Sequence, residues 1–316
     1  MLLTGIECLK HLNDMTKLND ETSSSFWNHY HSDFDFDGEN FSGLKMLGDS
    51  HYNQSVIKRL LYGLSDKLFQ STYHKYSSNK QRFNELNRIS HKISKTSNTR
   101  HNLSKTRHSL TLDFLLEFLG AKLTKNSNVC VIGDGYANMS SLLVASKSAS
   151  KVFLINLNKS LLLDLVSLKN IFINSEFLNS ICLVSDKKSL IKSFDVKYKI
   201  VAISSMNYDL LQYCPIDLVI NINSMQEIDK HITEKYFNYM RIIASKRTLF
   251  FYCCNRELKK LPDGTIIDFF KFPWNDSDDI LIDELCPWQQ DYYSMYPPFF
   301  HSYDGPTRHR LVRLSK

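Results

Sequence analysis

The residues most able to bind a ligand follow a run of four apolar side chains at positions 129–132. Gly133, Asp134 and Gly135 come next, and apolar residues then recur at the spacing of a helix. This order predicts a buried strand, a tight turn and a helix, the usual start of a nucleotide-type binding half-domain. The two glycines let the backbone bend sharply and let a ligand approach without meeting a Cβ atom.

The glycine turn departs from a dinucleotide-binding fingerprint at two positions. That fingerprint needs a third small residue where this chain has Asn138, a poor fit where a helix packs closely on a strand. The acid that usually binds a ribose hydroxyl is replaced by Asn156, whose amide can still form the bond without the strength of a carboxylate. Because Asn138 disfavours a pyrophosphate, we expect a ligand with an adenosine but no pyrophosphate, such as S-adenosylmethionine.

Further candidates follow the other expected strands, because ligands of open α/β sheets bind beyond the carboxyl ends of the strands. Ser205 and Asn223 occupy such positions, and we expect both to contact the cofactor with Gly133, Asp134, Gly135 and Asn156. Glu227 lies one helical turn past the fourth strand and is the first candidate for a general base. Ser224 followed by Glu227 is also a capping-box pattern, which is the competing structural explanation.

The last quarter of the chain supplies the remaining candidates. His301 and His309 are the alternative bases, because an imidazole can accept a proton near neutral pH. Arg256 follows the fifth strand, where a guanidinium suits a carboxylate or phosphate, and we expect Arg256, Asp304 and Trp274 to anchor the substrate.

Alternating strand and helix patterns must position these residues. Expected strands cover 128–132, 151–155, 199–203, 216–222 and 247–254, and an amphipathic helix lies within 224–244. Continuous apolar runs such as 218–220 indicate strands buried on both faces, and therefore a mostly parallel sheet. Residues 309–314 alternate between polar and apolar side chains and predict a late, antiparallel edge strand.

The chain divides into two expected regions. Residues 1–110 form a helical, basic region in which Leu60, Leu61, Leu64 and Leu68 recur at helical spacing. Within it, 77–109 is polar and predicts an exposed loop or a loosely packed helix. A short helix at 111–120, ending at Gly120, leads into the main domain at 111–316. An aromatic subdomain at about 256–308 suits either a carbohydrate-binding wall or ordinary core packing.

Charge and composition narrow the class of protein. The 316 residues carry a net charge of +6, yet twelve lysines and arginines and only two acids lie between Lys58 and His108. This 58–108 window favours an anionic partner, such as nucleic acid, a membrane surface or a phosphorylated glycan carrier, although a solvated helical face is the simpler explanation.

The sequence lacks three features that would indicate a membrane protein, an exported protein or a structural zinc site. No run of about 18 apolar residues occurs, so no membrane span is expected, and residues 1–7 lack the features of an export signal. Seven cysteines lie mostly inside apolar runs, which favours reduced core thiols in a cytoplasmic protein. Because no C-x-x-C pair occurs, no structural zinc is expected.

Several blocks of sequence together resemble one enzyme family. They are Gly133-Asp134-Gly135, 217–222, Ser224-Met225-Gln226-Glu227, Tyr236-Phe237, 251–256, 261–264, 272–274, 297–299, 303–306 and 309–311. Spread over about 130–311, they are similar to sugar O-methyltransferases of bacterial surface-glycan gene clusters. The resemblance implies a Rossmann-like class I methyltransferase sheet with a helical N-terminal extension. It also implies S-adenosylmethionine as cofactor and a sugar, sugar nucleotide or lipid-linked glycan of polysaccharide biosynthesis as substrate.

Three other functions remain open at this stage. A nucleic-acid methyltransferase would use the basic 58–108 window, but the chain has Asn223-Ser224-Met225-Gln226 where a base-binding Asn-Pro-Pro-Tyr pattern would stand. No stable nucleic-acid partner is therefore expected. A sugar-nucleotide oxidoreductase or epimerase would need a third glycine near 138 and a Tyr-x-x-x-Lys pair, and neither is in place. The last of the three is a non-catalytic binding protein, which Asn156 suggests because it replaces the usual ribose-binding acid.

Overall fold

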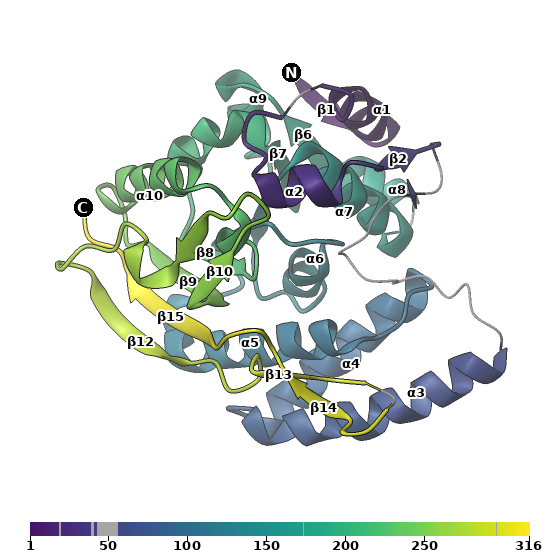
Figure 1. Ribbon diagram of the computed structural model, residues 1–316. Coiled ribbons are helices and arrows are strands. Elements are labelled where there is room, and N and C mark those ends of the chain that lie inside the picture. Colours follow the sequence, from purple (N-terminus) through teal and green to yellow (C-terminus); the bar gives the residue numbers. More distant parts are fainter. Residues whose placement is uncertain (19, 39–40, 43–55, 173, 295) are drawn as a thin grey trace.

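A mixed sheet forms the centre of the molecule (Figure 1). The computed structural model describes residues 1–18, 20–38, 41–42, 56–172, 174–294 and 296–316. Within them the main sheet has nine strands, in the order β1 (Leu2–Thr4), β6 (Ile181–Val184), β7 (Ile200–Ser204), β5 (Lys151–Asn156), β4 (Asn128–Ile132), β8 (Leu218–Ile222), β9 (Phe250–Arg256), β15 (Thr307–Arg313) and β12 (Asp279–Leu285).

The six strands from β6 to β9 run parallel, whereas β1 and β15 are antiparallel to their parallel-strand neighbours and β12 is antiparallel to β15. This sheet confirms the expected α/β, Rossmann-like fold class. The five expected strands lie within a few residues of β4, β5, β7, β8 and β9. The late strand β15 is antiparallel as expected, but it is not at the edge, because β12 pairs along its other side.

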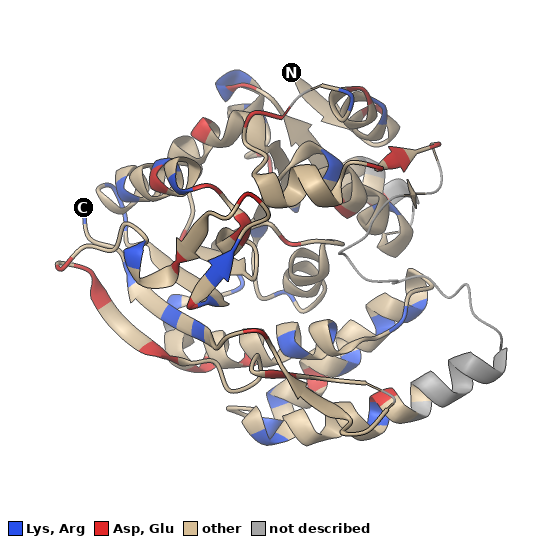
Figure 2. Cartoon of the chain, viewed as in Figure 1, with Lys and Arg blue, Asp and Glu red and all other residues tan. Residues whose placement is uncertain are grey.

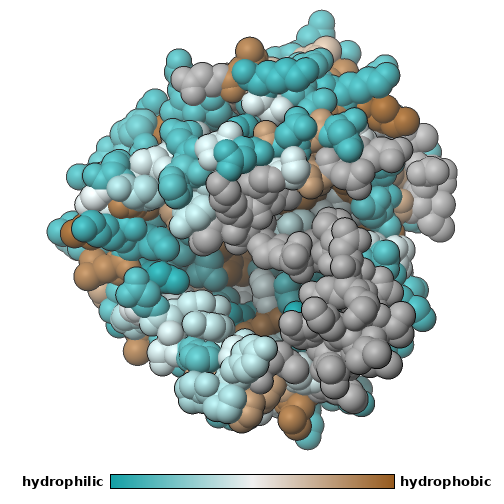
Figure 3. Space-filling view, turned by 45° about the vertical axis from the view of Figure 1, so that its right-hand side comes forward, coloured by the Kyte–Doolittle hydropathy of each residue, from teal (hydrophilic) through white to brown (hydrophobic). Residues whose placement is uncertain are grey.

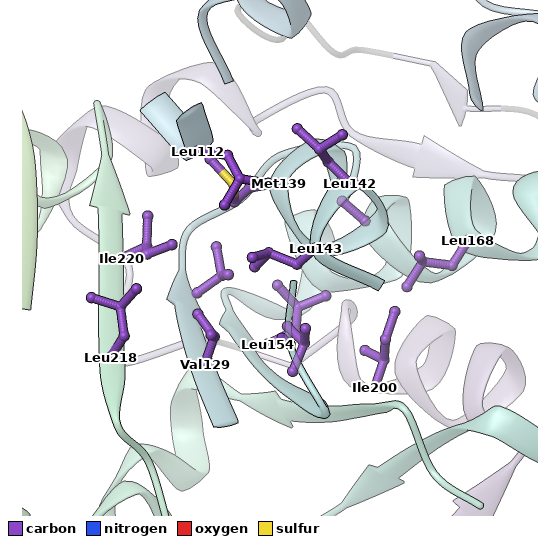
Figure 4. Packing of buried hydrophobic residues seen from close by; sticks show 14 of the residues in the cluster. Leu112, Val129, Met139, Leu142, Leu143, Leu154, Leu168, Ile200, Leu218 and Ile220 are labelled. Carbon is purple, nitrogen blue, oxygen red and sulfur yellow. The ribbon is translucent and has the colours of Figure 1, made fainter. Parts of the chain in front are cut away.

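Helices cover both faces of the sheet. One core contains residues of α1 (Ile6–Met15), α4 (Lys80–Thr96), α5 (Leu103–Leu119), α6 (Asn138–Ala145) and α7 (Asn158–Ile171). The other core contains residues of α2 (Ser25–Tyr30), α9 (Lys187–Lys192) and α10 (Lys230–Ala244). Val129 and Val131 face the first core and Cys130 and Ile132 the second, because successive strand residues point to opposite faces. In Figure 4, Leu143 of α6 points towards the strand residues of the first core, among them Val129 and Leu154.

Shorter elements complete the chain. They are helices α3 (Val56–Ser71) and α8 (Asn174–Ser180), the strand pairs β2 (Asp35–Phe36) with β3 (Phe41–Ser42), β10 (Leu258–Lys260) with β11 (Ile266–Asp268) and β13 (Asp291–Tyr293) with β14 (Phe300–Ser302), and 3-10 helices at Thr72–Tyr76, Gly120–Lys122, Ser205–Tyr213, Met225–Glu227 and Phe269–Lys271. No helix in the described part of the chain is long and apolar enough to cross a bilayer.

The polar stretch 77–109 forms helices, which was one of its two predicted alternatives, but these helices are closely packed instead of loose. It contains α4 and the first turns of α5, and Lys105 to Leu115 of α5 are all buried. Their polar side chains find partners far along the chain; for example, Thr106 Oγ1 donates to Gln70 Oε1 at 2.7 Å. α5 also runs across position 110, and β1 pairs with β6 at the edge of the main sheet. The N-terminal region is therefore continuous with the sheet domain.

The aromatic residues near the C-terminus pack against helix α3. The Phe69 ring lies 5.2 Å from the Tyr293 ring, 5.6 Å from Phe299 and 5.5 Å from Phe300. These contacts join α3 to the β13–β14 hairpin, which runs beside it in Figure 1. These three aromatic residues of the segment at 256–308 therefore contribute to tertiary packing, the alternative to a carbohydrate-binding wall.

Candidate active-site cleft

A cleft of about 860 Å³ opens beyond the carboxyl ends of β4, β5 and β8. Its sheet side is lined by Gly133, Asp134, Gly135, Asn156, Ser205, Asn223 and Glu227. Its opposite wall consists of the end of α4, the α4–α5 turn and the first turns of α5. The volume falls within the roughly 300–1,000 Å³ of small-molecule pockets. Hydrophilic side chains predominate on the side of the molecule shown in Figure 3.

The glycine turn has the left-handed backbone that its sequence requires. Gly133 and Gly135 have φ of +70° and +61°, and Tyr136 and Ala137 continue at +62° and +50°. A Cβ atom on Gly133 would lie 2.5 Å from the Cβ of Ser224 and closer still to its Oγ. Only glycine therefore allows β4 to end this close to the turn that follows β8.

Asp134 stabilises the turn and the start of α6. Its carboxylate accepts hydrogen bonds from the backbone N–H groups of Met139 at 2.8 Å and Ser140 at 2.7 Å. These are N–H groups that the first turn of a helix cannot satisfy internally. Asn138 donates to the Gly135 carbonyl at 3.0 Å. Asp134 thus lies at the cleft, as expected, but both its oxygens already hold the loop together.

Asn156 is held by a buried carboxyl group that the sequence analysis did not single out. Its amide donates to Asp164 Oδ2 at 2.8 Å, and the backbone N–H of Ala137 donates to Asp164 Oδ1 at 2.8 Å. Asp164 is fully buried, and burial, followed by the neighbouring charge of Asp134, raises the pKa of its carboxyl group. Its position in the apolar run Leu161–Leu165 was the one sequence signal that could have marked it.

The segment before α2 crosses the rim of the cleft. Asp20 accepts a hydrogen bond from Ser205 Oγ at 3.2 Å, and Thr22 Oγ1 donates to Ser205 Oγ at 2.7 Å. Ser24 Oγ donates to the backbone carbonyl of Glu227 at 2.5 Å. Ser205 is therefore at the expected place, with its hydroxyl bound to the N-terminal segment.

Glu227 lies in the cleft and does not form the expected capping box. Ser224 Oγ instead donates to the Ile132 carbonyl at 3.0 Å, and α10 begins only after Asp229. Glu227 is the last residue of the 3-10 helix Met225–Glu227 and is 8% exposed. Burial raises the pKa of Glu227 to about 8, and the charges of Lys259 and Arg256 only partly oppose this shift. Glu227 is therefore mainly protonated at neutral pH.

The two charged anchors expected near Glu227 flank the cleft without lining it. Arg256 lowers the pKa of Glu227 through its charge, and its guanidinium lies 5.5 Å from the centre of the Tyr303 ring. Asp304 is exposed and acts electrostatically on Lys259, which in turn acts on Glu227. Asn223 does line the cleft, with φ of +56° and an amide contact to Gln289 Oε1 at 3.4 Å.

The structure places the two histidine candidates and Trp274 away from the cleft. His309 is fully buried in β15, where its Nδ1 lies 3.1 Å from the Tyr252 hydroxyl. His301 is on β14, stacked on Tyr292 and 3.0 Å from Ser294 Oγ. Trp274 packs on Phe237 and Phe251 in the second core. The sequence showed that these three residues come late in the chain, after most of the strands. It did not show whether their side chains point towards the cleft.

The α5 wall contains two cleft residues that sequence reasoning missed. Lys105 Nζ donates to Ser94 Oγ at 3.0 Å, Thr99 Oγ1 at 2.7 Å and the Arg100 carbonyl at 3.0 Å. His108 is 7% exposed and lines the cleft, and its Nδ1 has no hydrogen-bond partner in the described part of the chain. Nothing in the polar run 104–109 distinguishes these two residues from their neighbours.

Part of the basic 58–108 window is used inside the protein. Arg82 pairs with Asp113 and Glu117, and Arg100 pairs with Asp66. Arg88, Lys92 and Lys95 are exposed on α4, whose positive residues appear blue in Figure 2. The side chains of Lys58 and Arg59 lie outside the described residues.

Comparison with known proteins finds similarity in solved structures alone. No family model and no curated protein matches the chain. M. capricolum TrmK, in complex with S-adenosyl-homocysteine, is 11% identical over 63% of this chain and 67% of its own, with a TM-score of 0.35. The methyltransferase domain of bacterial CtHen1 is 14% identical over 67% and 100%, with a TM-score of 0.36. An rRNA methylase from Streptococcus thermophilus is 12% identical over 65% and 96%, with a TM-score of 0.32. Likeness this distant says nothing about function, and the fold class follows from the strand order.

Proposed function

We propose that this chain is an S-adenosylmethionine-dependent methyltransferase. The observation that carries the proposal is the glycine turn, which opens into the same cleft as the buried carboxyl group of Glu227. A ligand at the turn would lie at the carboxyl ends of the strands, where α/β sheets bind nucleosides. Asn138 in place of a third glycine disfavours a dinucleotide.

The residues of the cleft suit this cofactor. The backbone of Gly133 to Gly135 would approach it without side-chain obstruction, while Asn156 and Asn223 supply uncharged polar groups beside the turn. Because Asp134 and Asp164 are occupied with N–H groups of the loop, most polar contacts would come from the backbone and from amides. When bound, the cofactor supplies an electrophilic methyl group on a sulfonium.

The chemistry of the protein consists of alignment and proton removal. A hydroxyl acceptor must lose its proton as the new O–C bond forms, and a carboxylate can accept it. Of the two acidic residues among the described lining residues, Asp134 already accepts hydrogen bonds from two backbone N–H groups, whereas Glu227 has a long side-chain contact with the Gln226 amide at 3.5 Å. A positive charge brought near it would favour its ionised form, as any nearby cation does.

We propose a sugar hydroxyl as the acceptor, carried by a free sugar, a sugar nucleotide or a lipid-linked glycan. Two of the blocks that resemble sugar O-methyltransferases, Ser224–Glu227 and the end of β9, meet at the cleft. Arg256 N donates to Gln226 Oε1 at 2.7 Å, and Asn255 Oδ1 accepts from Gln226 N at 3.1 Å. The blocks therefore form one unit behind Glu227.

A nucleic-acid acceptor is the second candidate. Arg88, Lys92 and Lys95 are exposed and spaced by four and three residues, which places them on one face of α4. The turn that follows this helix lines the cleft. A nucleic acid bound to that face of α4 would therefore extend towards the cleft. Its affinity for the protein would fall steeply as the salt concentration rises.

Transfer of a labelled methyl group separates these possibilities. The purified chain would be incubated with methyl-labelled S-adenosylmethionine and, in parallel, with sugar nucleotides, lipid-linked glycans and total RNA. We expect label in the glycan samples and a fall of roughly 10²-fold or more with Glu227→Gln. Lys92→Glu with Lys95→Glu should leave glycan methylation unchanged. Label in RNA alone, abolished by the lysine changes, would overturn the sugar proposal.

A further inference from the structure

Polar side chains line the wall of the cleft that lies opposite the glycine turn. The one cation among them already uses its hydrogen-bond donors inside the protein. The polar lining residues of this wall are Ser97, Asn98, Thr99, Asn102, Ser104, Lys105 and His108. Lys105 is the one cation among the described lining residues, and its three donor hydrogens are directed to Ser94, Thr99 and the Arg100 carbonyl. An ammonium group has no fourth donor, so Lys105 is not available to bind a phosphate.

His108 lies in this wall with an unsatisfied ring nitrogen. The residue is 7% exposed, and Nδ1 is enclosed by protein atoms without a hydrogen-bond partner in the described part of the chain. A molecule in the cleft would therefore reach the ring through Nε2, for which no hydrogen bond is found among the described residues. Burial, followed by the charges of Lys105 and Arg107, lowers the pKa of His108 to about 4. Its ring is therefore neutral at physiological pH.

We propose that this wall is the acceptor subsite, and that His108 positions an uncharged, hydroxyl-bearing acceptor by hydrogen bonding. This inference rests on the proposed methyltransferase function and goes beyond it, because it assigns the acceptor side of the cleft and its chemistry. In a neutral imidazole Nε2 is either a donor or an acceptor, and a hydroxyl group can pair with it in both cases, whereas an anion can only accept.

The charges around the cleft point to the same class of acceptor. The acidic lining residues are Asp134 and Glu227, both on the sheet side. The neighbouring cation Arg107 is turned away from the wall, donating to the Tyr303 hydroxyl at 2.7 Å and to the Asp291 carbonyl. An anionic group at the wall would therefore face these carboxyl groups, and Lys105, the one cation among the described lining residues, has no hydrogen-bond donor left for it.

Matched pairs of sugars test the subsite. Saturation-transfer NMR on the full chain, saturated with S-adenosylhomocysteine, would compare methyl α-glucoside and methyl α-mannoside with glucose 6-phosphate and mannose 6-phosphate. We expect at least one neutral glycoside to bind more tightly than its phosphate. His108→Leu should weaken that binding by about tenfold, and His108→Gln, which keeps a donor and an acceptor, should restore part of it.

Two controls make the result interpretable. His101→Gln alters a histidine whose two ring nitrogens already bind Gln70 and Ser90, so it should leave glycoside affinity unchanged. Asn98→Gly removes a second polar group of the wall at a residue with φ of +53°, where glycine is unstrained, and should also weaken glycoside binding. It provides an independent variant if His108→Leu fails to fold.

The outcomes are distinct for the two proposals. Failure of S-adenosylhomocysteine to bind the wild-type chain would overturn the methyltransferase proposal and the subsite with it. Normal S-adenosylhomocysteine binding, combined with tighter binding of the phosphates, no glycoside binding, or glycoside binding that ignores His108→Leu and Asn98→Gly, would overturn the subsite alone.

Discussion

Glu227 owes its chemical character to burial more than to a charged partner. Its nearest polar side-chain contact is the Gln226 amide at 3.5 Å, and the two cations that act on it do so from further away. A carboxyl group in this position is a hydrogen-bond donor at neutral pH and becomes a base only as it ionises. The same residue would therefore bind at low pH and catalyse at higher pH.

The raised pKa of Glu227 makes a prediction about stability. Its pKa rises from 4.5 to about 8 on folding, so the stabilising contribution is complete below about pH 4.5 and is lost as pH rises through about 8. Across that window, the free energy of unfolding of the wild type minus that of Glu227→Gln should fall by about 1.4 kcal/mol per pH unit. Urea denaturation at a series of pH values measures this difference. A difference that does not change with pH would show that the buried carboxyl titrates normally.

Gly133 is constrained by its neighbour as well as by its backbone. Gly133→Ala would place a Cβ against Ser224, so we expect a loss of about 2–3 kcal/mol in the free energy of unfolding. Gly264→Ala is the matched control, because Gly264 has φ of +90° but nothing within 4 Å of its Cβ position. It should cost only the backbone strain, about 1 kcal/mol. Equal losses in thermal melts of the two variants would mean that the contact with Ser224 is unimportant.

At the scale of elements, helix α5 joins the sheet domain to the N-terminal helices. Its buried polar residues depend on partners in other elements, among them Gln70 of α3 and Ser94 of α4. Gln70 lies 36 residues before Thr106, and the contact of Lys105 with Ser94 depends on how α5 packs on α4. The polar composition of 77–109 therefore gave no indication that the segment is packed. Strands such as β4 and β5, which are apolar on both faces, could be predicted from local pattern alone.

Residues of the candidate site could be predicted from the sequence where the strand or turn before them could be predicted. The glycine turn, Asn156, Ser205, Asn223 and Glu227 could be placed because each directly follows a strand or turn that the apolar pattern reveals. His309 could not, because its orientation depends on how β15 pairs between β9 and β12. Asp164 and His108 come from helix interiors, where only the three-dimensional packing shows that they approach the turn and the cleft.

Lys105 should hold the α4–α5 turn in place. Lys105→Met keeps the length of the side chain but removes three hydrogen bonds made by a buried ammonium, and we expect it to lower the free energy of unfolding by about 2–3 kcal/mol. Hydrogen exchange at 97–101 should accelerate. Lys92→Met, on the exposed face of α4, should change stability by no more than about 0.5 kcal/mol. Unchanged exchange in Lys105→Met would mean that other contacts fix the turn.

At the scale of the whole molecule, the described parts of the N-terminal region contact the sheet domain at several places. β1 pairs with β6, Ser24 binds the Glu227 carbonyl and Phe69 packs on the β13–β14 hairpin. These contacts lie at the edge of the sheet, at the rim of the cleft and on the C-terminal hairpin. Removal of the N-terminal region would therefore break contacts at three separate places.

A truncated chain tests this unity. We expect residues 103–316 alone to lack a cooperative unfolding transition, because the loss of α1 and α4 exposes much of the first core. Circular dichroism during heating, with the full chain measured in parallel, gives the comparison. A sharp transition in the fragment, at a temperature close to that of the full chain, would show instead that the N-terminal region is a separate appendage.

The central claim is that the cleft at the glycine turn binds an adenosine-containing methyl donor. Isothermal titration calorimetry of the full chain with S-adenosylhomocysteine tests it most directly, with NAD as the comparison ligand. We predict one molecule of S-adenosylhomocysteine bound per chain, no measurable heat with NAD, and loss of binding in Gly135→Val, because its branched side chain would fill the approach to the turn. Tight binding of NAD, or no binding of S-adenosylhomocysteine at millimolar concentration, would contradict the account.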